Sequence, residues 1–89
     1  MIYIACPEKL ATGGTELLHQ FYEKLKKLDS GVKIFYYNYS NNGSPIPERF
    51  LKYKVEYVTE LEDNKENFII FPEVATKKLK KYKKSKKSI

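Results

Sequence analysis

The chain has 89 residues, which is enough for one small domain, or for part of a larger one, with a thin core. Its formal charge of +6 is unevenly placed, because residues 77–89 carry eight lysines and no acid, whereas residues 1–76 carry nine basic and eleven acidic residues. The single cysteine excludes an internal disulfide and any zinc site built from cysteines. No apolar run approaches membrane-spanning length, and with the lone cysteine this predicts a cytoplasmic location.

Residues 1–37 predict one β-α-β unit. Residues 2–5 are all apolar, as is typical of a strand buried on both faces of a parallel sheet, and Pro7 is expected to end that strand. Gly13 and Gly14 are expected to turn the chain into a helix. Residues 32–37 are β-branched and aromatic and predict the next strand, which a right-handed crossover places parallel to the first.

The helix between these strands is expected over residues 15–28. Its apolar side chains fall on one continuous stripe of a 3.6-residue wheel, with Gly31 as the expected left-handed cap. The stripe consists of Leu17, Leu18, Phe21, Tyr22, Leu25 and Leu28.

The remaining pattern predicts further α/β structure. We expect a polar loop over residues 38–47 and a short helix over 48–54 that buries Phe50, Leu51 and Tyr53. Strands are expected over 55–58 and 68–71, a second long helix over 74–83, and the start of another strand at 88–89. The sequence therefore predicts a single Rossmann-like α/β unit. Its sheet is small, open and parallel, with the first strand central and helices on both faces.

The glycine pair marks the expected site, because parallel sheets place their ligands at the carboxyl ends of the strands. A dinucleotide fingerprint requires three spaced glycines and an acid after the second strand, and a Walker loop requires a Gly-Lys-Ser/Thr sequence; neither pattern is present. Two alternatives stay open. Gly13 and Gly14 form either a phosphate- or sugar-binding turn at a helix start, or a turn with no ligand.

Four other side chains have both a structural and a chemical interpretation. Glu16 is either a first-turn acid or a general base, and Glu73 is either a first-turn acid of the second helix or a ligand group at a strand end. His19 lies at the border of the apolar stripe, where a structural histidine is the default. Cys6 has no base beside it in the sequence and is expected to be an inert thiol.

The segment Gly13-Gly14-Thr15-Glu16, with the leucines that follow and Gly31 before a β-rich strand, resembles the start of GT-B glycosyltransferases. The segments Ile-Ala-Cys-Pro and Gly-Gly-Thr-Glu-Leu-Leu-His-Gln are similar to those of a bacterial group of these enzymes that is linked to surface-polysaccharide synthesis. The resemblance is strongest over residues 1–37, and after them the strand and Pro-Glu-Val turn at residues 69–74 also fit.

This resemblance implies a two-domain, metal-independent enzyme that moves a sugar from a nucleotide donor to a glycan acceptor. Gly13, Gly14, Thr15 and Glu16 would line the acceptor side of the cleft, with Glu73 near it. The C-terminal domain that holds most nucleotide contacts has no counterpart here. The expectation is therefore an N-terminal segment that does not catalyse alone, with no metal, no cofactor and no assigned catalytic residue.

The lysine-rich segment 77–89 favours a second hypothesis, a non-catalytic binding module that docks on an anionic surface. Anionic membranes attract such clusters, whereas nucleic acid is less favoured because Tyr82 is the one aromatic available for stacking. The alternative is a solvated helix face. An incomplete sheet would also expose edges, so self-association is expected. The lysines proposed to contact the anionic surface are Lys77, Lys78, Lys80, Lys81, Lys83 and Lys84.

Overall fold

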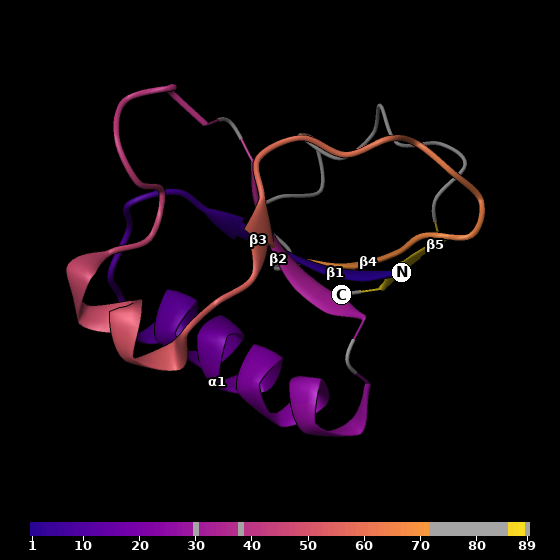
Figure 1. Ribbon diagram of the computed structural model, residues 1–89, viewed down its shortest axis with the longest axis horizontal. Helices are drawn as coiled ribbons and strands as arrows, with labels where there is room; N and C mark the ends of the chain where they lie inside the picture. Colours follow the sequence, from indigo (N-terminus) through magenta and orange to yellow (C-terminus); the bar gives the residue numbers. More distant parts are fainter. Residues whose placement is uncertain (30, 38, 72–85, 89) are drawn as a thin grey trace.

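The computed structural model describes residues 1–29, 31–37, 39–71 and 86–88 (Figure 1). The predicted helix at residues 74–83 lies outside the described residues, as do Glu73 and the six lysines between positions 77 and 84. The described elements are β1 (Ile2–Pro7), α1 (Gly13–Leu28), β2 (Val32–Tyr37), the 3-10 helix η1 (Glu48–Tyr53), β3 (Tyr57–Val58), β4 (Phe68–Ile70) and β5 (Lys86–Ser88).

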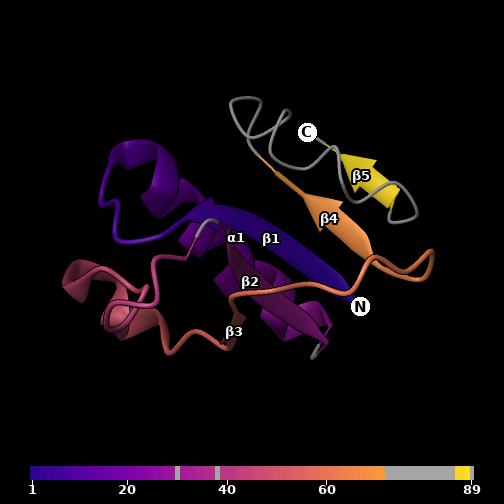
Figure 2. The same ribbon diagram turned by 90° about the horizontal axis from the view of Figure 1, so that it is seen from above.

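The five strands form one parallel sheet in the order β3-β2-β1-β4-β5 (Figure 2). The first strand is central, as predicted, and β2 has the bounds expected from the sequence. β1 runs two residues further than expected, because Pro7 stays in register with Tyr37 as the last residue of the strand. A proline is tolerated there because the missing N–H falls at the end of the ladder.

Side chains alternate along the strands and build a core on each face of the sheet. One core lies between the sheet and α1, which covers this face along much of the sheet (Figure 1), and consists of Ile4, Cys6, Tyr22, Val32, Ile34 and Tyr36. The other contains Ala5, Phe35, Tyr37, Ile69 and Phe71, with Val58 and Leu61 packed against it. β1 is therefore buried on both faces, as its apolar sequence predicts.

α1 starts at Gly13, two residues earlier than expected, and Thr12 is its N-cap. Gly13 and Gly14 open the helix, as expected, but they occupy its first two helical positions and not a turn before it. Among the described residues, Gly43 is the one glycine with positive φ, at 74°. Gly31 is not the cap residue, because α1 ends at Leu28 with Asp29 as its C-cap in an extended conformation, and the N–H of Asp29 donates to the carbonyl of Leu25 at 2.8 Å.

The predicted apolar stripe of α1 is correct on one side and wrong on the other. Leu17, Phe21 and Leu28 are 66%, 41% and 85% exposed. The residues that face the sheet fully are Thr15, His19 and Tyr22, spaced by four and three positions. A narrow sheet covers only part of a wide stripe, and Tyr36 and Phe50 supply a polar and an aromatic partner that draw His19 inside.

The short helix η1 buries Phe50 completely and leaves Leu51 56% exposed, which corrects the expectation that both are buried. In a 3-10 helix the side chains at i and i+3 share a face, so Phe50 and Tyr53 point the same way and Leu51 does not. η1 packs beside α1 on the same side of the sheet (Figure 1). No helix in the described part of the chain is long and apolar enough to cross a bilayer.

Candidate functional site

A cavity of about 380 Å³ opens at the carboxyl end of β1, against the first turns of α1. This is the edge of the sheet at which the sequence predicts a site. The walls are mostly apolar and are formed by Pro7, Leu10, Thr12, Gly14, Thr15, Leu17 and Leu18.

Gly13 and Gly14 leave open space at the start of α1, and Gly14 lines the cavity. A Cβ at Gly13 would meet no atom within 4 Å, and a Cβ at Gly14 would meet the hydroxyl oxygen of Thr12 at 3.8 Å. Neither backbone conformation nor packing against the described chain therefore requires glycine at these positions. A requirement for glycine there would come from a molecule that approaches the backbone from outside.

The amide groups of the same two residues are available to a ligand. Within the described residues no acceptor is recorded for the N–H of Gly13 or Gly14, whereas the N–H of Thr15 and that of Glu16 donate to the hydroxyl and carbonyl oxygens of Thr12 at 3.2 and 2.9 Å. Free N–H groups at a helix start favour acceptors that carry negative charge, because the helix dipole adds to them.

Thr15 holds the floor of the cavity in place. Its hydroxyl accepts from the N–H of Thr12 at 2.8 Å and donates to the carbonyl of Leu10 at 2.7 Å, and the residue is 4% exposed. Thr12 and Thr15 thus form a reciprocal capping box. The hydroxyl and N–H of Thr15 are thus hydrogen-bonded to Thr12 and Leu10, so we assign Thr15 a structural role at the cavity and not a ligand-binding one.

Glu16 points to η1 and not into the cavity. Its carboxylate lies 3.9 Å from the guanidinium of Arg49 and 3.7 Å from the ammonium of Lys52, and it accepts from the hydroxyl of Tyr53 at 3.4 Å. These contacts tie the first turn of α1 to η1. The structure therefore favours a bracing role for Glu16 over that of a general base.

The loops that follow β1 and β2 are joined beside the cavity. The hydroxyl of Ser40 donates to the carboxylate of Glu8 at 3.2 Å, and the N–H of Lys9 donates to the carbonyl of Pro45 at 2.8 Å. The ammonium of Lys9 donates to the carbonyl of Asn42. These hydrogen bonds hold together the two loops at the carboxyl ends of β1 and β2, although none of the five residues lines the cavity.

His19 is a structural residue of the core. It is fully buried, and its Nδ1 and Nε2 atoms lie 2.7 Å from the carbonyl of Thr15 and 2.7 Å from the hydroxyl of Tyr36. Burial lowers its pKa, against smaller raising effects of the Thr15 carbonyl and the charge of Glu16. Both ring nitrogens are satisfied, so neither is free for proton transfer to a ligand.

Two further chemistries find no support among the described residues. Burial raises the pKa of the Cys6 thiol to about 12, so the thiolate that a nucleophile needs is scarce at neutral pH. No group of three His, Cys, Asp or Glu side chains in the described ranges is placed to hold a metal ion. The site offers backbone donors and apolar walls for binding.

The structure brings Gly13, Gly14, Thr15 and Glu16 together in the first turn of α1, and Gly14 and Thr15 line the cavity. Glu73, which was expected near this site, lies outside the described residues. Sequence reasoning missed the apolar wall and the N-cap Thr12. The Thr-x-x-Thr spacing before an apolar run was the available signal for that cap, although the usual capping box has Glu or Gln at its last position.

No protein-family model matches the sequence, and neither a curated protein nor a solved structure matches the chain.

Proposed function

We propose that this chain is the N-terminal, acceptor-side segment of a nucleotide-sugar-dependent glycosyltransferase. The observation that carries the proposal is the cavity at the carboxyl end of the central strand, which Gly14 lines and beside which α1 begins at Gly13. A Cβ at either glycine would meet no clash within the described chain. A Gly-Gly-Thr-Glu helix start after a central parallel strand is the feature on which the resemblance to GT-B enzymes rests.

The chemistry of the cavity suits a glycan acceptor. Sugar rings have apolar faces, which can pack on Leu10, Leu17 and Pro7, and hydroxyl or phosphate oxygens, which can accept from the amides of Gly13 and Gly14. The described residues offer no general base at the cavity, since Glu16 is paired with Arg49 and Lys52. The nucleotide sugar and the catalytic base would come from a second domain, and the 89 residues alone would be inactive.

The first test is the coding sequence downstream of the Ile89 codon. The proposal expects the reading frame to continue into a second, nucleotide-binding domain, and the extended protein to transfer sugar from a nucleotide donor. In that protein Gly14→Ala should lower transfer with the fold intact, whereas Gln20→Ala, on α1 and outside the cavity, should not. A stop codon directly after Ile89 would contradict the proposal.

A second candidate function rests on the charge of the sequence. Residues 77–89 carry eight lysines and no acid, which favours docking of a non-catalytic α/β module on an anionic membrane. Each lysine near such a surface contributes about 1 kcal/mol. Co-sedimentation with phosphatidylserine vesicles should be strong at low salt and lost at high salt, and the same titration with single-stranded RNA shows whether nucleic acid is the target instead. Binding to neither would end this candidate.

A further inference from the structure

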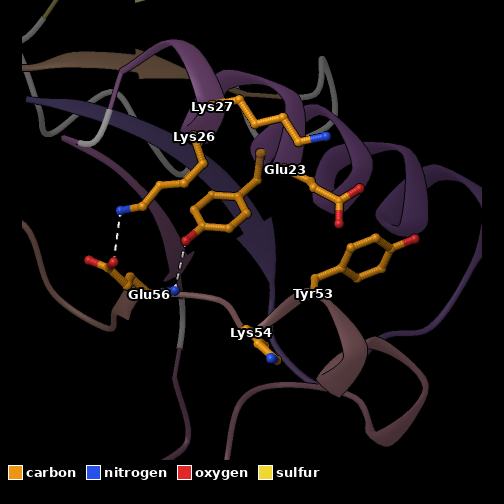
Figure 3. Close-up of a pocket in the computed structure, with 7 residues that line it drawn as sticks. Glu23, Lys26, Lys27, Tyr53, Lys54 and Glu56 are labelled. Carbon is orange, nitrogen blue, oxygen red and sulfur yellow. Dashed lines mark hydrogen bonds and ion pairs between the residues drawn. The ribbon is translucent and has the colours of Figure 1, made fainter.

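A second pocket, of about 280 Å³, lies between the second half of α1 and the segment that leads from η1 to β3 (Figure 3). It shares no lining residue with the carboxyl-edge cavity, and it is lined by Tyr22, Glu23, Lys26, Lys27, Tyr53, Lys54 and Glu56. We call it the lysine pocket. Its volume is close to the lower end, about 300 Å³, of pockets that hold small ligands.

One wall of the lysine pocket is fixed by contacts within the chain. The N–H of Glu56 donates to the hydroxyl of Tyr22 at 2.9 Å, and its carboxylate lies 2.8 Å from the ammonium of Lys26 (Figure 3). The carbonyl of Glu56 accepts from the N–H of Ile34 in β2 at 3.0 Å. Tyr22 itself is 2% exposed. The pocket is therefore formed before any ligand enters.

The charges in the pocket are incompletely matched. Lys26 is neutralised by Glu56, an interaction that raises the pKa of Lys26 and lowers the pKa of Glu56, in both cases mainly through their hydrogen bond. Lys27 and Lys54 have no ion-pair partner among the described residues, and Glu23 has none there either. Figure 3 shows Lys27 extending on the side of Glu23, away from the Lys26–Glu56 pair. Two ammonium groups thus remain against one carboxylate.

Lys54 has an unfavourable backbone conformation for its residue type. Its φ of 49° and ψ of 52° are left-handed, where glycine and asparagine are favoured. The chain nevertheless has a long cationic side chain at this position, directly on the pocket. A residue held in a sparsely populated conformation motivates a hypothesis of function.

We propose that the lysine pocket binds a small phosphate monoester. The ammonium groups of Lys27 and Lys54 outweigh the carboxylate of Glu23 by one positive charge, which favours a phosphate anion. The rings of Tyr22 and Tyr53 form apolar walls for the organic part. Glu23 limits the affinity by repelling the anion and can accept hydrogen bonds from ligand hydroxyls. The pocket is a binding site independent of the acceptor cavity, and its function does not rest on the glycosyltransferase proposal.

The test is a titration of the ¹⁵N-labelled chain with phenyl phosphate, followed by amide chemical shifts, at an ionic strength held constant with sodium chloride. We expect saturable shifts at Lys27, Tyr53, Lys54 and Glu56. Phenol should give much smaller shifts, because it lacks the phosphate. Linear shifts that sodium chloride reproduces would overturn the proposal.

Three variants make the test specific. Lys54→Gly should keep or raise the melting temperature, because glycine suits the left-handed conformation. The same change should weaken phenyl phosphate binding about fivefold, which corresponds to the upper end of the free energy of one partly exposed ion pair. Glu23→Gln should tighten binding, since it removes a like charge. The matched control Lys24→Gln removes an α1 lysine outside the pocket and should change the affinity little. Unchanged affinity in Lys54→Gly, or weaker binding in Glu23→Gln, would overturn the proposal.

Discussion

The Nε2 atom of His19 lies 2.7 Å from the hydroxyl oxygen of Tyr36, in the core between α1 and the sheet. The tautomer follows from the other nitrogen, because Nδ1 faces the carbonyl oxygen of Thr15, which can only accept. Nδ1 therefore carries the proton, and Nε2 accepts from the Tyr36 hydroxyl. Protonation of Nε2 would set two donors against each other unless the hydroxyl turned away.

The first prediction is a loss of stability in mild acid. The folded-state pKa of His19 is lowered, so the unfolded chain binds the extra proton more readily near its ordinary pKa of 6.5. The contribution of His19 to the free energy of unfolding is fully present above pH 6.5. It falls as the pH drops from 6.5 to the folded-state pKa, and it does not change further below that pKa. Urea midpoints measured from pH 8 to pH 5 should show this fall. His19→Gln should be less stable at pH 8 but lack the fall, and an equal fall in the variant would contradict the assignment.

The second prediction concerns Tyr36→Phe, which removes the donor to His19 and leaves Nε2 buried without a partner. We expect a loss of about 1–3 kcal/mol in the free energy of unfolding, the cost of an unsatisfied buried polar group. Urea denaturation at pH 8 measures it. Tyr57→Phe is the matched control, because Tyr57 packs edge-on against Tyr36 but is 42% exposed, and it should change stability little.

The third prediction tests whether glycine is needed at positions 13 and 14 for folding or only for ligand binding. Gly13→Ala and Gly14→Ala meet no clash and lie in helical positions, so each should keep or raise stability, by up to about 1 kcal/mol. Gly43→Ala is the contrasting change, because φ is +74° there, and it should destabilise the chain by about 1 kcal/mol. Melting temperatures of the three variants provide the measurement. Destabilisation by Gly13→Ala or Gly14→Ala would show that the helix start needs glycine for its own structure.

The fourth prediction compares two neighbours in η1. Phe50 is fully buried and its ring centroid lies 4.5 Å from that of His19, so Phe50→Ala should cost about 3–5 kcal/mol. Leu51 is 56% exposed, and Leu51→Ala should stay within about 0.5 kcal/mol of the parent. Equal losses in urea denaturation would contradict the 3-10 assignment, which puts these side chains on different faces.

Much of the sheet could be predicted from local pattern. β2 is β-branched and aromatic throughout and has the predicted bounds, and the apolar run of β1 correctly indicated a central strand buried on both faces. The cap assigned to Gly31 was wrong because the helix ends at Leu28 with Asp29 as its C-cap, two residues earlier than Gly31. Periodicity correctly placed α1 and the side of it that bears Tyr22, whereas Leu17 is exposed and His19 is buried.

The edge of the sheet that bears the cavity could be predicted, whereas the contacts around the cavity could not. The carboxyl-edge rule indicated Gly13 and Gly14, and a cavity lined by Gly14 lies at that edge; the binding roles of these residues stay a prediction. The pairing of Glu16 with Arg49 could not be read from the sequence, because the two residues are 33 positions apart and meet only once η1 packs on α1. The lysine pocket depends in the same way on contacts across 34 positions, from Tyr22 to Glu56.

The acceptor-side proposal is tested most directly by titrating the ¹⁵N-labelled chain with short glycans and their phosphate-linked forms, and following the amides of Gly13 and Gly14. The account predicts saturable shifts at both amides, their loss in Gly14→Ala, and no comparable effect of a nucleotide sugar alone. Glycan-induced shifts confined to other parts of the chain, with both glycine amides unchanged, would contradict it.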